Sequence, residues 1–496
     1  MAFTDRLANR GSISTASYDV EYSVLLDGQY SDGSINQTGG DRKTHTISFW
    51  HKRAPWGAYN SDGDGGIDAT TNDLWGTDSE GDTLRFNGSD LCFFHEGGTG
   101  SSLVTDRKFR DCAAWYHFVV AIDTTQQTAA NRIKIYVNGV QETDFSTETY
   151  PDEDDEFKLM QNGQDFNIGM GHSPTYNAMG YYADFYIIDG AALAPTEFGE
   201  FDSASGIWKP KEYDGDVNVG SGTNGGHYKF EGTAEGTGSG ATGLDSSGEG
   251  NHINFRNQYG AMLDTPTNNF CVINNQANRN YDTPSGGLEL GGCRVQGTSS
   301  GWATWLCTMP FSSGKWYFEA EDIGNYIAFG IMNVDLTDKL YEISGAEAIA
   351  YRTWNGGALA RDGNADVSTG LGAPDSNNWV WGFWIDMDNG KFSVANRDGA
   401  TGTVLDEVDI GDCFDNGRMV IPFIRIYNNT DLNVNFGKNG FWRSNNRPGW
   451  YASFNHNGRA DDNGYGLFEY YPNGGPSGNN GKKYYTLCTK NLAEFG

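Results

Sequence analysis

The stretch WVWGFWIDMDNGKFSVANRD, from Trp379 to Asp398, decides the fold. In an extended chain, alternate residues point to opposite faces, and large apolar side chains of Trp379–Ile385 fall on both faces. A strand that is apolar on both faces is typical of the interior of a packed sheet. Asp388-Asn389-Gly390 then supplies residues that tolerate a positive φ, and alternation resumes at Lys391, which predicts a β-hairpin.

A second hairpin of the same kind lies far upstream. Tyr116–Asp123 (YHFVVAID) is an apolar run that ends in Ile-Asp, and Arg132–Val140 (RIKIYVNGV) alternates before it turns at Asn138-Gly139. Short strands separated by Asp, Asn and Gly clusters surround both hairpins, as in antiparallel sandwiches. The sequence therefore predicts two β-sandwiches, each with such a hairpin near its centre.

Composition agrees with an all-β fold. The 496 residues include 68 Gly and 14% aromatic residues but only 20% charged residues, a balance that suits short strands and turns. No long amphipathic helix is predicted. The expected organisation is an N-terminal arm (1–18), a first sandwich (19–210), a Gly/Ser/Asn-rich connector with short strands (211–300) and a second sandwich (301–496). The arm is either a disordered tail or a segment that docks on a neighbouring subunit.

Charge and cysteine usage exclude several classes of function. A net charge of −31 argues against nucleic-acid binding, because phosphate contacts need Lys and Arg. No apolar run reaches the ~18 residues that span a bilayer, and the N-terminus lacks the apolar core of a secretory signal. Seven cysteines without metal spacing are expected to be buried thiols. The histidines show no paired spacing and are mostly expected at the surface.

Two family resemblances follow from these segments. Residues 20–210 resemble the concanavalin A-like lectin/glucanase or laminin-G-type jelly roll, through TISFWHKR, WYHFVVAID and RIKIYVNGV. Residues 310–492 resemble the SPRY domain, through SGKWYFEAE, YIAFGIMN, WVWGFWIDMDNGKFSV and LNVNFGKNGF. Their order, with LDSSGEGNHINF, MLDTPTNNF and a terminal LCTKNL, is similar to tailed-bacteriophage proteins described as tail-fibre or virion structural proteins.

The resemblance implies a non-enzymatic virion component that is assembled in the host bacterial cytoplasm. Its expected partners are other virion proteins, further copies of itself (a trimer, by analogy) and a host surface glycan, with no nucleic acid and no membrane insertion. A collar, baseplate or head-decoration subunit is the first alternative. A polysaccharide depolymerase is the second, since the concanavalin A-like fold also includes glucan hydrolases.

The sequence assigns no catalytic residue. Retaining hydrolysis needs two carboxylates about 5 Å apart, and in the glucanase family they follow a Glu-x-Asp-x-Glu pattern on one strand. Asp152–Glu156 follows a proline without alternation and is interpreted as a solvated loop. Glu319 and Glu321 share one face of a strand, but in the half that resembles SPRY, where the resemblance implies no hydrolase.

One acidic loop is a candidate calcium site, although no cofactor is required. Its spacing follows an EF-hand-type loop, in which oxygen ligands recur at alternate positions and Gly65 allows the bend. Thr71 stands where a bidentate carboxylate is wanted, and no flanking helices are predicted, so a polar surface loop is the alternative. The candidate ligands are Asn60, Asp62, Asp64, Asp68 and Asp73.

Aromatic residues in loops give the candidate sugar contacts. Aromatic faces beside Asp and Asn can hold a sugar by stacking and hydrogen bonds, but they can equally cap a sandwich or contact another subunit. Around the acidic loop the candidates are Trp56, Tyr59 and Trp75. In the second half, where the SPRY resemblance places ligands at loops on one end, they are Tyr351, Arg352, Trp354 and Asn355.

Overall fold

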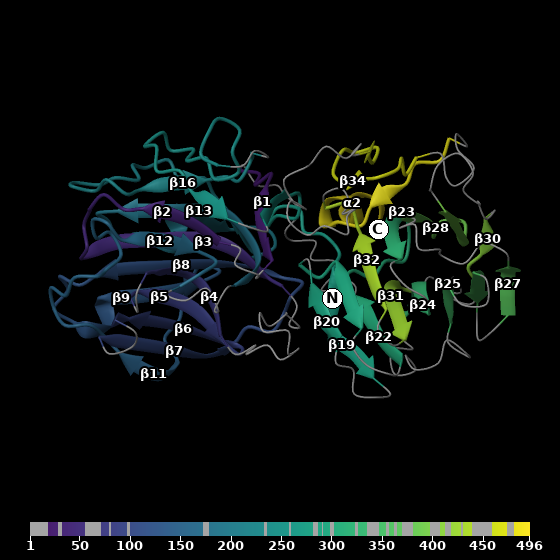
Figure 1. The fold of residues 1–496 in the computed structure, drawn as a ribbon, viewed down its shortest axis with the longest axis horizontal. Helices are drawn as coiled ribbons and strands as arrows, with labels where there is room; N and C mark the ends of the chain where they lie inside the picture. Colours follow the sequence, from purple (N-terminus) through teal and green to yellow (C-terminus); the bar gives the residue numbers. More distant parts are fainter. Residues whose placement is uncertain are drawn as a thin grey trace.

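The computed structural model describes two β-sandwiches that lie side by side (Figure 1). It describes residues 18–27, 32–54, 71–78, 81–96, 100–171, 178–232, 236–256, 259–280, 286–289, 291–297, 302–322, 326–334, 347–353, 357–361, 365–369, 380–396, 407–411, 418–427, 430–438, 459–473 and 481–496. The predicted N-terminal arm lies outside these residues except for Tyr18. The predicted all-β fold with two antiparallel sandwiches is confirmed.

The first sandwich consists of two eight-stranded sheets. Sheet 1A runs in the order β10 (Val140–Gln141), β9 (Ile133–Val137), β8 (Trp115–Asp123), β3 (Thr44–Arg53), β13 (Met179–Asp189), β1 (Ser23–Asp27) and β18 (Tyr259–Met262), and β16 (Gly226–Tyr228) also pairs with β13. Sheet 1B runs in the order β11 (Phe145–Thr149), β7 (Ser101–Lys108), β6 (Asp90–His95), β5 (Thr83–Asn87), β4 (Thr71–Thr77), β12 (Asp165–Ile168), β2 (Asp32–Asn36) and β17 (Asn254–Arg256). A ribbon of β14 (Gly199–Phe201) and β15 (Trp208–Pro210) lies outside both sheets.

The second sandwich is built in the same way. Sheet 2A runs in the order β19 (Ile273–Asn280), β22 (Trp302–Cys307), β31 (Val420–Tyr427), β24 (Ile327–Asn333), β25 (Ala348–Arg352), β26 (Ala358–Arg361) and β27 (Ala365–Thr369). Sheet 2B runs in the order β20 (Gly286–Glu289), β21 (Arg294–Gly297), β32 (Asp431–Asn435), β23 (Lys315–Asp322), β28 (Val380–Asp386), β29 (Lys391–Asn396) and β30 (Val408–Asp409). β35 (Tyr485–Thr486) adds to β23 in parallel, and β33 (Arg459–Ala460) pairs with β34 (Leu467–Phe468).

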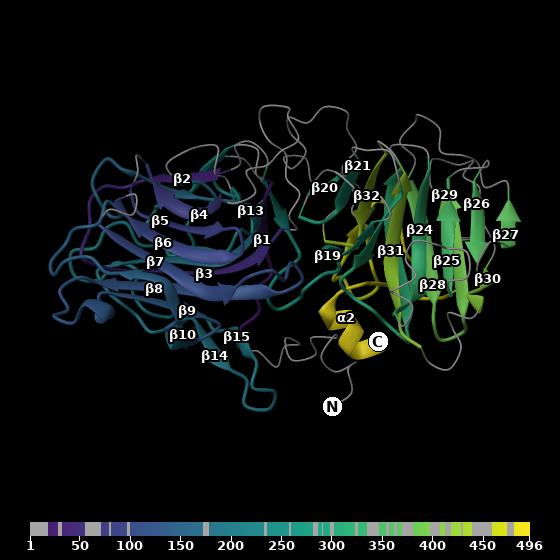
Figure 2. The same cartoon turned by 90° about the horizontal axis from the view of Figure 1, so that it is seen from below.

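Helices are short in the described part of the chain. They are the 3-10 turns η3 (Ala129–Asn131) and η4 (Pro195–Glu197) and the helix α2 (Thr489–Phe495). Figure 2 shows α2 at the boundary between the two halves. None of the described helices has the length and apolarity that crossing a membrane requires.

The hairpin that decides the fold forms as predicted. β28 lies between β23 and β29, and all its residues are buried. Trp381 belongs to the core between the two sheets, whereas Trp384 packs on the other face with Tyr317 and Phe468. The apolar residues on both faces of the strand therefore reflect cover on both faces. The upstream turn is also confirmed, because Asn138 and Gly139 have φ values of 49° and 79°.

The predicted connector contributes strands to both sandwiches. Its first part supplies β16, β17 and β18 to the sheets of the first sandwich, and Tyr228 and Ile253 are buried in that core. Its last part supplies β19, β20 and β21 to the second sandwich. The chain passes from one sandwich to the other in residues 263–272, a much shorter segment than the composition suggested.

Most of the described cysteine and histidine side chains are buried. The six described cysteines are free and buried, as predicted: Cys92, Cys112, Cys271, Cys293, Cys307 and Cys488. The prediction that most histidines lie at the surface is wrong, because five of the described ones are buried: His45, His51, His95, His117 and His227. Four of them, His45, His51, His117 and His227, lie in strands of sheet 1A, both of whose faces are covered, so these histidines are shielded from solvent.

Candidate functional sites

Asp73 is the described member of the candidate calcium ligands. Its side chain is buried in β4, and neither carboxylate oxygen has a hydrogen-bond partner among the described residues. Burial raises the pKa of Asp73 to about 7, against the opposing effects of the Arg85 charge and of the nearby Gly171 amide, which does not reach hydrogen-bond geometry. A buried carboxylate without a partner fits a cation ligand. The other candidates lie outside the described residues: Asn60, Asp62, Asp64 and Asp68.

The described residues alone do not make a metal centre. Among them, no three or more His, Cys, Asp or Glu side chains are grouped so that they could hold a metal ion. A calcium site at Asp73 would therefore need oxygen ligands from the preceding loop, as the sequence spacing proposes.

Trp75 does not expose its ring, which corrects the prediction that it is available to a sugar. It is fully buried in the first core, with its ring centroid 6.1 Å from that of Phe93 and 5.8 Å from that of Phe166. The pairing of β4 with β5 shifts register between Asp73 and Trp75. A bulge of this kind re-aims side chains, so simple alternation fails here. Trp56 and Tyr59 lie outside the described residues.

Tyr351 is also a core residue, against the prediction. It is 3% exposed, and its ring stacks on that of Trp381 with centroids 4.3 Å apart. Arg352, the next residue, points to the opposite face of sheet 2A and is 9% exposed. Trp354 and Asn355 lie outside the described residues. Of the two described members of this group, Arg352 faces the outer side of sheet 2A, where it is still buried.

Glu319 is buried in the middle of sheet 2B and accepts four hydrogen bonds. The Tyr317 hydroxyl (2.9 Å) and the backbone amide of Tyr470 (2.9 Å) donate to Oε1. The amide of Glu469 (3.0 Å) and the side chain of Asn435 (3.3 Å) donate to Oε2. Burial raises the pKa of Glu319 to about 7, against these hydrogen bonds. The carboxyl group therefore joins β23 to the segment that covers it and has no open side for a sugar.

Glu321 lies on the same face of β23, as predicted from the spacing, but is likewise buried. It is 3% exposed and accepts a hydrogen bond of 3.0 Å from Asn433 Nδ2. Retaining hydrolysis requires two carboxyl groups that face a substrate, and this pair faces protein. The other acidic run, Asp152–Glu156, is exposed over most of its length, in agreement with a solvated loop.

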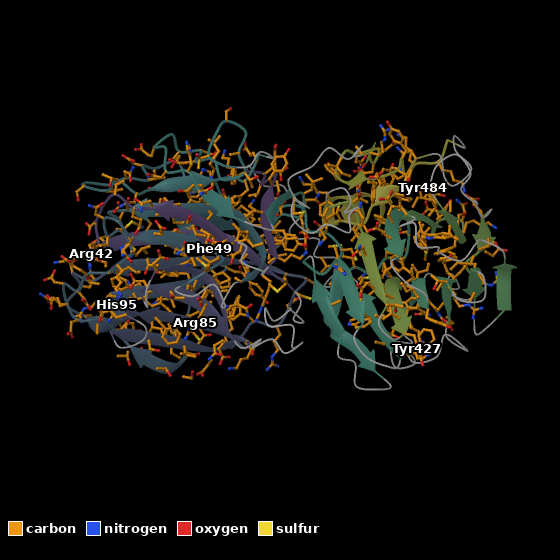
Figure 3. The ribbon with its side chains drawn as sticks, in the orientation of Figure 1. Arg42, Phe49, Arg85, His95, Tyr427 and Tyr484 are labelled. Atoms are coloured by element: carbon orange, nitrogen blue, oxygen red, sulfur yellow. The ribbon has the colours of Figure 1, made fainter. Side chains whose placement is uncertain are left out.

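An Asp-His-Asp chain that sequence reasoning missed lies toward the end of the first sandwich remote from the second (Figure 3). His95 Nδ1 is 2.5 Å from Asp82 Oδ1, and His95 Nε2 is 3.4 Å from Asp155 Oδ2. Burial lowers the pKa of His95, but the hydrogen bond and charge of Asp82 outweigh burial, so the pKa is raised.

This chain lacks a nucleophile among the described residues. Ser101 pairs with His95 across the strands, but its buried hydroxyl has no described hydrogen-bond partner. A nucleophile must be within hydrogen-bond reach of its base. The Asp-His-Asp chain is therefore interpreted as a structural link that connects β6 to the acidic run Asp152–Glu156.

A buried ion cluster joins the two sandwiches. Asp264 lies between them and is 2.8 Å from Lys52 Nζ and 3.8 Å from Lys438 Nζ. Trp115 Nε1 donates to the same carboxylate at 3.1 Å, and Lys52 also donates to Asn269 Oδ1 at 2.6 Å. Burial lowers the pKa of Lys52, Asp264 opposes that effect, and Lys438 adds to it.

Direct bonds between the sandwiches surround this cluster. Tyr181 of β13 donates to the Gly291 carbonyl at 2.9 Å, and Lys438 Nζ donates to the Tyr181 hydroxyl at 2.6 Å. The apolar strand that carries Lys52 was a signal in the sequence, since a charge inside such a strand needs a buried partner. The partner is distant in the sequence, so no local pattern could identify it.

The linker 263–272 is itself tied to both sandwiches. The Val20 amide donates to Thr267 Oγ1 at 3.1 Å on one side. On the other side the Asn269 amide donates to Thr489 Oγ1 at 2.9 Å, and the Thr489 amide donates back to the Asn269 carbonyl at 2.8 Å. The linker is therefore hydrogen bonded to both sandwiches and does not behave as a flexible connection between them.

Comparisons with known proteins give a family match for the first half. The family model described as the Concanavalin A-like lectin/glucanases superfamily matches residues 27–197. The chain therefore contains a concanavalin A-like, laminin-G-type domain, where the sequence predicted one. No curated protein matches the chain.

Several solved structures are similar to parts of the chain. The SPRY domain of human HERC1 is 13% identical, with 33% of this chain and 96% of that chain covered and a TM-score of 0.25. The PSpry domain of TRIM65 is 13% identical, with 33% and 91% covered and a TM-score of 0.27. The heptameric SAP-like pentraxin of Limulus polyphemus is 13% identical, with 36% and 80% covered and a TM-score of 0.27.

Proposed function

We propose that this chain is a non-enzymatic structural component of a bacteriophage virion, of the tail-fibre or adhesin type, that binds glycans of the host surface. The observation that carries the proposal is the ion cluster at Asp264, which fastens two sandwiches into one body. A subunit that holds its place in a particle needs such a joint, because loosely linked domains move relative to one another by default. The order of the sequence motifs supports the virion assignment.

The proposal includes the partners of the chain. It assembles in the host cytoplasm with other virion proteins and with further copies of itself, as a trimer by analogy with fibres. A net charge of −31 disfavours a nucleic-acid partner, and the chain inserts in no membrane. The concanavalin A-like domain supports glycan binding, since the matched family includes lectins.

The burial of the two candidate catalytic glutamates supports a role without catalysis. Glu319 and Glu321, the pair spaced for hydrolysis, are buried and hydrogen bonded. A depolymerase would release reducing sugar from host polysaccharide and lose that activity in Glu319→Gln or Glu321→Gln. We expect no release by the unaltered protein.

Two measurements test the proposal. Antibody labelling of purified particles should place the protein on the virion, and absence from particles would contradict the virion role. Purified protein should bind host cells and lose that binding after periodate oxidation of the surface sugars. Binding that survives oxidation would contradict the glycan as the receptor.

A purely structural collar, baseplate or head-decoration subunit is the second candidate. It is favoured by the burial of Trp75 and Tyr351, two of the aromatic residues expected to contact sugar. Firm incorporation into particles without any binding to host cells would select this candidate.

A further inference from the structure

The outer face of sheet 2A carries a group of aromatic and basic side chains at one end. Alternate residues of its strands point into the core, as Trp305 of β22 and Ile424 of β31 do. Trp302, Arg425 and Tyr427 therefore point outward, because side chains of a strand alternate between faces. All three are partly exposed. Tyr427 lies at the lower rim of the second half in Figure 3.

Three aromatic rings form a continuous row across β22, β31 and β24. Trp302 and Tyr427 are direct cross-strand partners, and their ring centroids are 5.0 Å apart. Tyr326, just before β24, packs its ring edge-on to Tyr427 at 5.8 Å and is 47% exposed. Such a row offers aromatic surface to a flat, partly apolar ligand.

Two arginines lie in the next row of the same face. Ala328 pairs with Arg425 on one side and with Arg352 on the other, so a small residue separates the two. The Arg425 guanidinium lies 4.4 Å from the centre of the Trp302 ring. Arg352, at 9% exposure, is set deeper. The two arginines and the aromatic row therefore share one end of one face.

The backbone at Tyr326 is strained. Its φ is 72°, in the left-handed region that a bulky residue rarely adopts. Hydrogen bonds hold the residue there, since the Tyr427 amide donates to the Tyr326 carbonyl at 3.1 Å and the Ile327 amide donates to Thr353 Oγ1 at 2.8 Å. Strained residues of this kind concentrate at ligand sites. Here the strain presents a half-exposed ring beside Tyr427, where packing alone does not require one.

We propose that this end of sheet 2A binds an acidic saccharide, which we call the acidic-sugar site (Trp302, Tyr326, Arg352, Arg425 and Tyr427). The aromatic row packs against the C–H face of a sugar ring, and Arg425 pairs with a ring carboxylate. Arginine is suited to that role, because its planar fork matches a carboxylate and stacks on aromatic faces at the same time. The inference rests on the proposed glycan binding and adds the location and the charge of the ligand.

Charge makes an acidic ligand the specific choice. A chain with a net charge of −31 repels anionic polysaccharide over most of its surface. The partly exposed Arg425 on the aromatic row therefore gives an anionic sugar a positive charge to approach. A neutral sugar would gain from the rings and could accept a hydrogen bond from Arg425, but it would lack the charge that strengthens that bond.

The test compares acidic oligosaccharides with their neutral esters. Oligogalacturonate, oligomannuronate and oligosialate, each beside its methyl ester, are titrated into the full chain by calorimetry. At least one acid should bind about tenfold more tightly than its ester, the effect of one charge-assisted hydrogen bond. The Arg425→Gln variant should bind the acid only as tightly as it binds the ester. The Tyr326→Asn variant should bind both the acid and the ester more weakly. Its fold should be kept, because Asn tolerates a positive φ.

The matched control is a second arginine that stacks on an aromatic ring outside the proposed site. Arg459 lies 4.5 Å from the ring of Tyr471, which is 55% exposed. Arg459→Gln should leave every affinity unchanged. Equal affinity for acid and ester, no binding of any of the three acids, or unchanged binding in folded Arg425→Gln and Tyr326→Asn would each overturn the site.

Host-cell adsorption separates failure of this site from failure of the proposed function. If wild type, Arg425→Gln and Tyr326→Asn all adsorb equally and periodate abolishes adsorption, the chain binds glycan elsewhere and only the acidic-sugar site is wrong. If wild type does not adsorb at all, the proposed glycan binding fails with it.

Discussion

A single carboxyl group at Glu319 shows how burial and hydrogen bonding compete. Four donors surround it, yet burial prevails and its pKa is raised from 4.5 to about 7. A carboxyl with a higher pKa in the folded state binds its proton more tightly when folded. Its contribution to stability is therefore present below pH 4.5 and is lost as the pH rises toward 7.

We expect the stability advantage of wild type over Glu319→Gln to shrink between about pH 5 and about pH 8. The variant cannot titrate, and its amide faces a backbone donor at all pH values, which costs about 1–3 kcal/mol. Urea unfolding followed by tryptophan fluorescence measures the difference at both pH values. Exposed Glu148→Gln is the control. A difference that does not change with pH would contradict the raised pKa.

Gly139 shows a second effect of single residues, because two requirements coincide there. Its φ is +79°, and an added Cβ would lie 2.4 Å from ring atoms of Trp208. Gly163 has a similar φ of +77° but nothing within 4 Å of such a Cβ. We expect Gly163→Ala to lose about 1 kcal/mol from the positive φ alone. Gly139→Ala should lose about 1–3 kcal/mol more through overpacking. Equal losses in urea unfolding would show that the Trp208 side chain moves aside freely.

At the scale of elements, the sequence could predict strands and turns but not their irregularities. The hairpin of β28 and β29 follows from alternation and Asn-Gly chemistry, which are local. The bulge in β4 is set by its pairing with β5, which alternation does not encode. Trp75 was expected at a loop because it follows the Gly- and Asp-rich stretch, but it lies inside β4 and is found in the core. The burial of Tyr351 has a similar cause, since its cover comes from Trp381 in the opposite sheet.

The start of β4 also makes the calcium proposal testable. If the loop before β4 binds calcium through Asp73, the metal binds only the folded chain and stabilises it by mass action. We expect EDTA to lower Tm and excess calcium to restore it. In Asp73→Asn the difference between EDTA and calcium should shrink. Magnesium is the control, because its smaller octahedral shell suits such a loop poorly. A Tm that EDTA leaves unchanged would contradict calcium binding.

At the scale of the whole molecule, the decisive residues are far apart in the sequence. Lys52 comes from β3, Asp264 from the linker and Lys438 from the segment after β32, and no local pattern relates them. The sequence could therefore predict two sandwiches but not the joint between them. The Gly-rich composition of 211–300 suggested a loose connector, whereas the linker is bonded on both sides.

The joint predicts how the chain unfolds. We expect wild type to unfold in one calorimetric transition, because separating the halves would expose the ion cluster. Asp264→Asn leaves two buried ammonium groups without a counter-charge, and breaking a buried pair costs about 3–5 kcal/mol. The variant should unfold in two transitions and be cleaved by protease within 263–272.

Two further variants separate the buried cluster from charge in general. Lys490→Met removes a pair with Asp19 that also connects the halves but is partly exposed, so it should cost less than about 1 kcal/mol and keep one transition. The combined Lys52→Met, Asp264→Leu and Lys438→Met replaces the buried ions by apolar groups, which often leaves stability unchanged. A single transition in that variant would show that burial at the joint couples the halves, with the charges fixing how they meet. If Asp264→Asn itself unfolds in one transition at the wild-type Tm, the cluster does not hold the sandwiches together.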